Sequence, residues 1–226
     1  MKLQERDKEI LKLCYEQNFL LSDHIRDHFF RGNRFHALRR IKELNESGYI
    51  RFEKYPMDSK RNLIRISRFG RMVTADMSPI EFPYYNAVSK YTLIHDALVT
   101  SVRLRLEQIW EAAWIPEMAL KQLDTLEVPD GILLFKSGTR VAIEVENSIK
   151  GKARFLKRLD AWRGESEKIV LYVATSGEVY RFLKDYLVHA PEKPQFALVL
   201  WNDLKSGKPT VWSPYGDLQI FSRRAL

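Results

Sequence analysis

Residues 128–146 read VPDGILLFKSGTRVAIEVE and show most clearly how the chain is arranged. Two apolar runs flank the turn KSGT at residues 136–139, and this pattern predicts a β-hairpin. Three carboxylates interrupt the apolar runs, at Asp130, Glu144 and Glu146. A carboxylate inside an apolar strand is costly unless it has a partner, so these positions require an explanation.

The spacing of the three carboxylates allows them to form one cluster. Glu144 and Glu146 are two residues apart, so they point to the same face of a strand, and a hairpin can bring Asp130 beside them. Three acidic groups at a sheet edge would bind a hard divalent cation through their oxygen atoms. The alternative is a solvent-facing strand that places both glutamates in water, with Asp130 serving the turn.

The order Pro129-Asp130, Glu144-Val145-Glu146 and then a basic helix resembles the PD-(D/E)XK nuclease superfamily. In that pattern the carboxylates hold Mg²⁺, and a lysine two residues after the glutamate helps to position or deprotonate the attacking water. This chain has Glu146 at the position of that lysine. Some restriction enzymes of the superfamily are active with Glu-x-Glu, whereas many relatives with altered motifs are inactive.

For an active site, the resemblance implies Mg²⁺ or Mn²⁺ as the cofactor, held by Asp130, Glu144 and Glu146 as metal-binding and catalytic residues. A substitute for the missing lysine would come from the helix that follows, from Lys150 or Lys152. The alternative is that both lysines belong to a solvated basic face that touches phosphate.

Composition limits the class of protein. The chain has 226 residues, of which 45% are hydrophobic, which is enough to bury a core. It has no apolar run of about 18 residues, and its N-terminus, MKLQERDKEI, is not a signal peptide. Cys14 is the single cysteine, and no Cys/His cluster suggests zinc. These features predict a cytoplasmic protein with no membrane partner and no small-molecule cofactor.

The positive charge is concentrated in the first third of the chain. The net charge is +8, and residues 1–78 hold 17 Lys and Arg against 11 Asp and Glu. Residues 79–226 hold 20 against 18. This asymmetry indicates a polyanionic partner for the N-terminal part, and the alternative is a basic surface that only aids solubility.

Hydrophobic periodicity in the N-terminal part predicts helices at 7–16, 23–29 and 34–47, strands at 49–55 and 62–67, and a short helix at 68–77. Ser22 is the expected N-cap of the second helix, and Gly48 the left-handed cap of the third. On the third helix the buried face is predicted to be Ala37, Leu38, Ile41 and Leu44. The outer face is predicted to hold Phe35, His36, Arg39, Arg40 and Glu43.

Three helices followed by a two-stranded hairpin resemble the winged helix-turn-helix of bacterial DNA-binding proteins, with HALRRIKELNESGYI (36–50) similar to a recognition helix and wing entry. The segment SRFGRMV (67–73) is similar to the exit from the wing. The resemblance implies a double-stranded DNA partner, read by the third helix in the major groove. Such regulators often dimerise, so a homodimer is the expected assembly. The implied DNA contacts are Asn33, Arg34, His36, Arg39 and Arg40 on the helix and Lys54, Lys60 and Arg61 on the wing.

The C-terminal part follows a junction at 79–92. A helix is predicted at 93–109, strands at 114–120, 128–135 and 141–145, a helix at 147–163, a strand at 168–174, a helix at 179–188 and a strand at 196–201, with peripheral hairpins over 203–226. This is the core order of the PD-(D/E)XK fold. The predicted class is α/β (α+β), with a winged-helix domain at 1–78 and a nuclease-like mixed-sheet domain at 93–226.

Together the two parts resemble the replication-relaxation family of mobile-element proteins, through the winged helix, His95, Pro116-Glu117, Pro129-Asp130 and Glu144-Val145-Glu146. The favoured hypothesis is a double-stranded-DNA-binding protein of regulatory or mobile-element (replication or mobilisation) type, whose nuclease-like domain is degenerate. The alternative is a Mg²⁺-dependent DNA endonuclease with an Asp…Glu-x-Glu site. A third hypothesis is an interaction module that binds other proteins.

Overall fold

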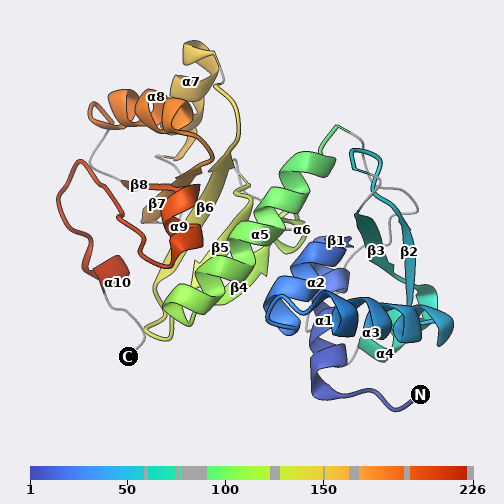
Figure 1. Cartoon of the computed structure of the whole chain (residues 1–226). Coiled ribbons are helices and arrows are strands. Elements are labelled where there is room, and N and C mark those ends of the chain that lie inside the picture. Colours follow the sequence, from blue (N-terminus) through green and yellow to red (C-terminus); the bar gives the residue numbers. More distant parts are fainter. Residues whose placement is uncertain are drawn as a thin grey trace. The chain divides into compact units, whose positions relative to one another are not determined.

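The computed structural model of the chain describes residues 1–58, 61–74, 77, 91–122, 128–149, 151–162, 168–190 and 194–222. The fold is mixed α/β with a three-stranded and a five-stranded sheet in the described part (Figure 1). The chain divides into two compact units, Met1–Thr100 and Ser101–Leu226. No helix among the described residues is both long enough and apolar enough to cross a membrane.

The boundary between the units falls within the helix α5 (Leu93–Trp110), and not before it as the predicted domain limits had it. The reason is that Leu93 and Ala97 join a buried cluster of the N-terminal unit that also contains Phe19, Leu21 and Leu63. The start of α5 therefore completes the N-terminal core. Residues 79–90 of the predicted junction lie outside the described residues.

The N-terminal unit contains the predicted helices and both predicted strands. In chain order its elements are α1 (Glu5–Gln17), β1 (Leu20–Leu21), α2 (Ser22–Phe29), α3 (Arg34–Glu46), β2 (Ile50–Lys54), β3 (Asn62–Ile66) and α4 (Arg68–Thr74). The sheet order is β1-β3-β2 with antiparallel pairing throughout. Strand β1 was not predicted, because two residues are too short to show an alternating pattern.

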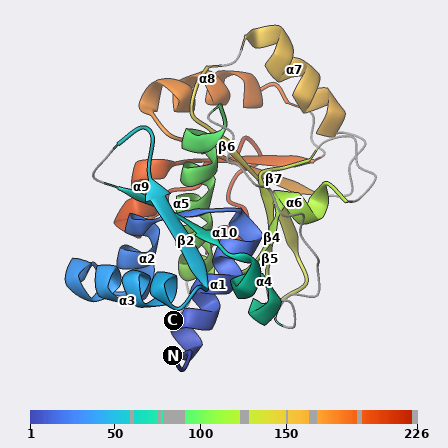
Figure 2. The ribbon, with the colours of Figure 1, turned by 90° about the vertical axis from the view of Figure 1, so that its right-hand side faces the viewer.

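Two turns fix the orientation of α3. Gly48, just after the helix, has a φ of 78°, which confirms the predicted left-handed cap. At the other end Asn33 is the N-cap, and its side-chain oxygen accepts a hydrogen bond from the backbone N–H of His36 at 3.0 Å. Ser22 is the first residue of α2, and the N-cap predicted there is instead Leu21. Figure 2 shows α3 and β2 together on the near side of the N-terminal unit.

The C-terminal unit is built on the five-stranded sheet, in the order β4-β5-β6-β7-β8. Strands β4 to β6 form an antiparallel meander, and β6, β7 and β8 run parallel, which confirms the predicted order of core elements. Its elements after α5 are β4 (Ala113–Pro116), α6 (Glu117–Leu120), β5 (Gly131–Leu134), β6 (Arg140–Glu146), α7 (Lys152–Ala161), β7 (Ile169–Ala174), α8 (Gly177–Leu187), β8 (Gln195–Leu200), α9 (Trp201–Ser206) and α10 (Gln219–Ser222).

Helices cover both faces of this sheet. Helices α7 and α8 pack on one face (Figure 1), where Phe155 and Leu183 join Tyr172 and Phe196 of the strands in one buried cluster. On the other face Trp110 of α5 contacts Phe135 beside β5, with ring centroids 6.5 Å apart. Because both faces are covered, the parallel strands β7 and β8 are almost entirely buried and apolar.

Three sequence predictions in this unit were wrong. The strand predicted over 114–120 ends at Pro116, and Glu117 begins the short helix α6, where it pairs with Lys121 at 2.8 Å. The helix predicted from 147 begins at Lys152. The hairpins predicted over 203–226 are replaced by α9 and α10, with one isolated bridge from Leu198 to Trp212. Glu117 is therefore not a strand carboxylate.

We expect acid to destabilise the N-terminal unit through His24. This side chain is buried, and its Nδ1 accepts a hydrogen bond from the backbone N–H of Leu21. Burial lowers the pKa of His24 from 6.5 to about 4. The unfolded state therefore takes up the proton first, and stability present above pH 6.5 is lost as the pH falls toward 4, by about 3 kcal/mol.

The measurement is the free energy of unfolding in denaturant across this pH range. His24→Gln keeps a neutral hydrogen-bonding side chain and should remove this part of the pH dependence. His36→Gln, at an exposed position of α3, is the control and should leave the pH profile unchanged. A pH profile that is the same with and without His24 would contradict the assignment.

Candidate functional site

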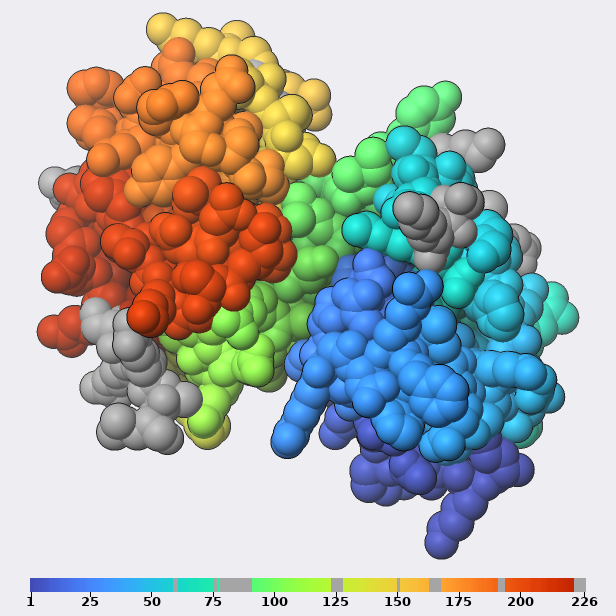
Figure 3. Space-filling model, in the orientation of Figure 1, coloured from blue at the N-terminus to red at the C-terminus, as the bar shows by residue number. Residues whose placement is uncertain are grey.

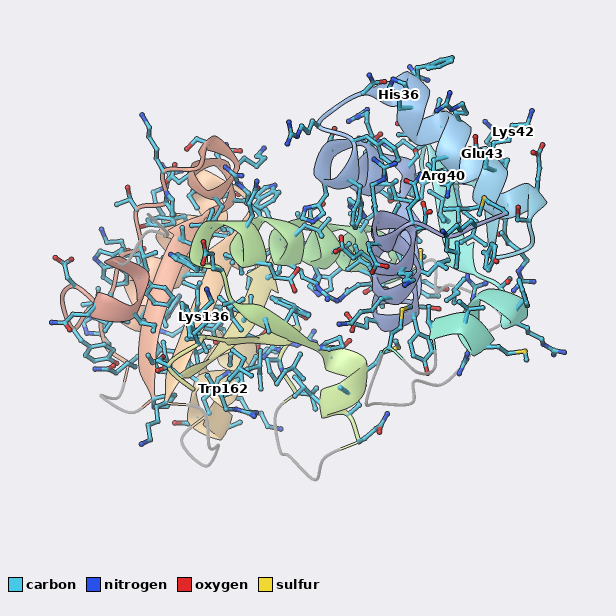
Figure 4. All side chains as sticks on the ribbon, turned by 90° about the horizontal axis from the view of Figure 1, so that it is seen from below. His36, Arg40, Lys42, Glu43, Lys136 and Trp162 are labelled. Carbon is cyan, nitrogen blue, oxygen red and sulfur yellow. The ribbon has the colours of Figure 1, made fainter. Side chains whose placement is uncertain are left out.

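The outer surface of α3 carries most of the side chains predicted to bind DNA. Asn33, Arg34, His36 and Arg39 are all exposed. Arg39 makes a loose ion pair with Glu43, with 3.7 Å between Nε and Oε1. In Figure 4, His36 and Lys42 project from the outer side of α3, and Figure 3 shows the α2 and α3 residues, in blue, forming much of the visible surface of the N-terminal unit.

Arg40 does not belong to this outer surface, although the sequence placed it there. Figure 4 shows it on the side of α3 that faces α1. Its guanidinium forms a two-point ion pair with the fully buried carboxylate of Asp7, and its Nη1 lies 2.6 Å from Oε2 of Glu43. The reverse holds for Leu38, which was predicted to be buried and is 38% exposed. The helix is therefore rotated slightly from its predicted orientation.

The Asp7–Arg40 pair holds two helices together. Burial opposes the charge on Asp7, but the hydrogen bonds from Arg40 and from the backbone N–H of Gln4 outweigh burial and lower the pKa of this carboxyl. The pKa of Arg40 is raised chiefly by its hydrogen bond to Asp7. Both groups are therefore charged at neutral pH. Arg40 positions α3 on α1, and its neighbours on the outer surface are oriented as a result.

The predicted wing contributes two described basic residues. Lys54 is exposed at the end of β2, opposite Asn62 of β3. Arg61 forms ion pairs with Asp23 of α2 at 3.1 Å and with Asp58 at 3.5 Å. Lys60 lies outside the described residues. Lys54 therefore faces solvent, whereas Arg61 is held by its ion pair with Asp23 of α2.

In the C-terminal unit, β6 carries both predicted glutamates on one face, and that face is buried. Glu144 is 1% exposed and Glu146 is 2% exposed. They share their side of the strand with Ala142, which packs in the core beneath α7 and α8. The alternative that placed both glutamates in water is therefore wrong. Two buried carboxylates this close to each other require a cation.

Arg158 of α7 supplies that cation. Its Nη2 lies 2.7 Å from Oε2 of Glu144, and its Nη1 lies 3.3 Å from Oε1 of Glu146, so one guanidinium bridges the two strand residues. Burial opposes the charge of Arg158, but Glu144 in particular, and Glu146 and Asp130 as well, raise its pKa. The carboxylate cluster therefore contains a permanent positive charge provided by the protein itself.

Asp130 lies beside this pair, as the sequence predicted. The β5–β6 pairing ends at Gly131 and Ile143, and continuing this register places Asp130 opposite Glu144. Its Oδ2 accepts a hydrogen bond of 2.7 Å from the backbone N–H of Val145. Asp130 thus satisfies the backbone N–H of Val145 in β6, and it does so from the position just before β5. The hairpin needs glycine at the next position, because a Cβ on Gly131 would lie 2.0 Å from the indole of Trp114.

A buried tyrosine completes the surroundings of the cluster. Tyr172 pairs with Glu144 in the β6–β7 ladder and is fully buried. Burial, and secondarily the charge of Glu144, raise the pKa of this phenol well above 10. Tyr172 is therefore neutral and cannot act as a base. The cluster is a hydrogen-bonded and ion-paired part of the core.

Of the two predicted catalytic lysines, the structure describes Lys152. Lys150 lies outside the described residues. The ammonium of Lys152 lies over the ring of Tyr186 on α8, 5.7 Å from its centroid. In the part of the chain that the structure describes, no group of three His, Cys, Asp or Glu side chains could hold a metal ion. As arranged here, the three carboxylates bind a guanidinium and a backbone amide.

Arg158 was not predicted as a site residue, although the sequence contained a signal for it. Of the cations on the basic helix, only Lys150 and Lys152 were considered as partners of the carboxylates. Arg158 lies three residues after Phe155 and directly before Leu159, and both of these side chains are buried. An arginine beside the buried stripe of a helix that follows two strand glutamates is well placed to pair with them.

Comparison with protein-family models, with curated proteins and with solved structures finds no match to this chain. The winged-helix, nuclease-like and replication-relaxation resemblances therefore stay predictions.

We expect Arg158→Ala to destabilise the C-terminal unit and to open the cluster to a divalent cation. Removing one partner of a buried ion pair typically costs about 3–5 kcal/mol, because the remaining charges lose their compensation. Mn²⁺ should restore part of the lost melting temperature in this variant, and it should not raise the melting temperature of the wild type. Thermal unfolding followed by circular dichroism, with and without millimolar Mn²⁺, measures both effects.

Arg154→Ala, at an exposed position one turn earlier on α7, is the matched control and should behave as the wild type. Adding Glu144→Gln to Arg158→Ala should abolish the response to Mn²⁺. A stabilisation by Mn²⁺ that is equal in the wild type and in Arg158→Ala would show that Arg158 does not take the place of a metal ion.

Proposed function

We propose that this chain is a double-stranded-DNA-binding protein of regulatory or mobile-element type, in which a winged-helix domain binds DNA and a nuclease-like domain serves as a scaffold that does not cleave it. The observation that carries the proposal is the outer surface of α3, where exposed basic side chains begin immediately after a capped turn. The order of three helices and a strand pair is the order of a winged helix.

The geometry of α3 suits the major groove. Arg34, His36 and Arg39 are exposed on its first half, the part of a recognition helix that approaches base edges. Arginine can bind guanine through two parallel hydrogen bonds, which gives sequence discrimination. Lys54 at the tip of the strand pair is placed to meet phosphate, which adds affinity without specificity. Arg40 has no part in this contact because Asp7 and Glu43 engage it.

The C-terminal unit supports the scaffold hypothesis through its chemistry. An active PD-(D/E)XK site would need Asp130, Glu144 and Glu146 to coordinate Mg²⁺ and a lysine beside the attacking water. Here the two glutamates are engaged by Arg158, and Glu146 takes the position of the lysine. A guanidinium between the ligands supplies charge compensation but cannot activate water as a bound metal ion does.

The second candidate function is a Mg²⁺-dependent DNA endonuclease. The observation that favours it is the convergence of Asp130 with Glu144 and Glu146 at one end of the β5–β6 pair. For this function Arg158 would have to leave the carboxylates when DNA and metal bind. The two candidates therefore differ in one measurable property, which is cleavage.

We expect Arg39→Ala and Arg40→Ala to affect different properties. Arg39→Ala should weaken binding to a DNA site selected from a random duplex library by about 1–3 kcal/mol, the value of a base contact, and leave the melting temperature unchanged. Arg40→Ala should instead lower the free energy of unfolding by about 3 kcal/mol, because it leaves the buried charge of Asp7 without its main partner. Gel-shift titration and denaturant unfolding measure the two effects.

Lys54→Ala extends this test to the predicted wing. It should weaken selected and random duplexes equally and reduce the slope of log affinity against log salt by about one. Lys8→Ala, on α1 and paired with Glu5, is the charge-matched control. If Arg39→Ala and Lys54→Ala together left every duplex bound as tightly as the wild type, DNA would not bind to this surface.

We expect the wild type to bind plasmid DNA without nicking it in Mg²⁺ or Mn²⁺. The assay follows conversion of supercoiled to relaxed plasmid, beside a gel shift on the same samples and a nuclease of known activity. Nicking by the wild type that disappears in Glu144→Ala, with the gel shift retained, would establish the endonuclease instead. Absence of both nicking and gel shift would leave the third hypothesis, a protein-binding module.

A further inference from the structure

A hollow of about 350 Å³ opens on the N-terminal unit where the start of α1, the end of α2 and the start of α3 meet. Its wall contains four arginines, Arg6, Arg31, Arg39 and Arg40, together with His36. A single carboxylate, Glu43, is part of the wall. The arginines come from three separate segments, so the folding of the unit concentrates positive charge in one concave place.

Two of these guanidinium groups are held in position before any ligand arrives. Arg6 lies over the ring of Phe30, with its central carbon 4.1 Å from the ring centroid. Its Nη2 donates a hydrogen bond to Gln4, and its buried Nε–H has no hydrogen-bond partner among the described residues. Arg40 is fixed by its ion pairs with Asp7 and Glu43, which offset its charge, so it forms part of the rigid wall.

The turn between α2 and α3 directs a third guanidinium. Arg31 has a φ of 48° and Gly32 a φ of 82°, so both residues adopt the left-handed conformation that L-residues other than glycine rarely occupy. The N–H of Gly32 donates a hydrogen bond of 3.0 Å to the carbonyl of Arg26, which closes the turn. Arg31 is exposed and lines the hollow, so its guanidinium is accessible to a ligand there.

We propose that this hollow is a binding site for a phosphate-type anion, which Arg6 and Arg31 contact directly and Arg39 stabilises by its charge. Arginine presents planar donors that match phosphate oxygens in pairs, and a fixed guanidinium loses little entropy when it binds. The phosphate belongs either to a nucleic-acid backbone or to a free phosphorylated small molecule. The first source rests on the proposed DNA-binding function, and the second does not.

The test uses the full chain and two probes, inorganic pyrophosphate and a duplex selected by the wild type. Pyrophosphate binding is followed by calorimetry and by the shifts of backbone amide resonances in nitrogen-15 spectra. The test variant combines Arg6→Gln with Arg31→Asn, since asparagine tolerates the left-handed conformation. The control combines Lys8→Ala with Lys136→Ala, which removes the same charge outside the hollow. Circular dichroism confirms that both variants are folded, and Arg31→Asn alone replaces the pair if Arg6→Gln unfolds the chain.

The expected result is that pyrophosphate binds the wild type, shifts the amides of residues 4–6 and 30–33, and binds about tenfold more weakly to the test variant than to the control. If the test variant also loses about tenfold in duplex affinity, and pyrophosphate displaces the duplex, the phosphate is that of a nucleic acid. If duplex affinity is unchanged, the ligand is a free phosphorylated molecule.

The proposal is overturned if the affinity for pyrophosphate falls equally in the test and control variants. It is also overturned if neither pyrophosphate binding nor duplex binding depends on Arg6 and Arg31. The proposed function fails by a different result, the absence of duplex binding by the wild type. In that case the pyrophosphate titrations still show whether the hollow binds an anion.

Discussion

The ion pair between Arg158 and the two glutamates of β6 is the interaction on which the C-terminal unit depends. Two carboxylates on one face of a central strand would destabilise the sheet if they were buried without a cation. Arg158 reaches both of them from α7, so the helix is tied to the sheet by charge as well as by the packing of Phe155 and Leu159. The same pairing limits the chemistry of the site, because the guanidinium of Arg158 occupies the position between the two carboxylates.

The N-terminal unit also contains a buried ion pair, and this one joins two helices. Asp7 is buried in α1 and receives the guanidinium of Arg40 from α3. This pair sets the rotation of α3, so Arg34, His36 and Arg39 face outward while Arg40 faces the core side. A DNA-binding surface needs side chains held in fixed positions. A buried ion pair favours one orientation of the helix, whereas apolar packing alone tolerates several. Arg40 thereby orients the exposed arginines Arg34 and Arg39.

The two units therefore combine an exposed basic surface with an internally neutralised acidic cluster. The first feature favours a polyanionic partner, and the second argues against metal-dependent hydrolysis by the same chain. Binding without cleavage, as proposed above, is consistent with both. The carboxylates can persist inside an apolar sheet because they are paired. They have a structural role, in which Asp130 caps a backbone donor of β6 and the glutamates anchor a helix.

The sequence by itself determined the elements whose patterns are local. The hairpin around residues 136–139, the two apolar core strands at 168–174 and 196–201, the helix over 34–46 and the cap at Gly48 followed from hydrophobic period and turn residues. The three carboxylates of interest were also identified. Tertiary structure alone decided the partners of the charged side chains. Arg40 and Arg158 resemble their surface neighbours in sequence, and each meets a carboxylate from an element elsewhere in its unit. A helical period distinguishes inside from outside only to within about one residue, and a buried charge is identified by its partner, which only the folded chain brings within reach.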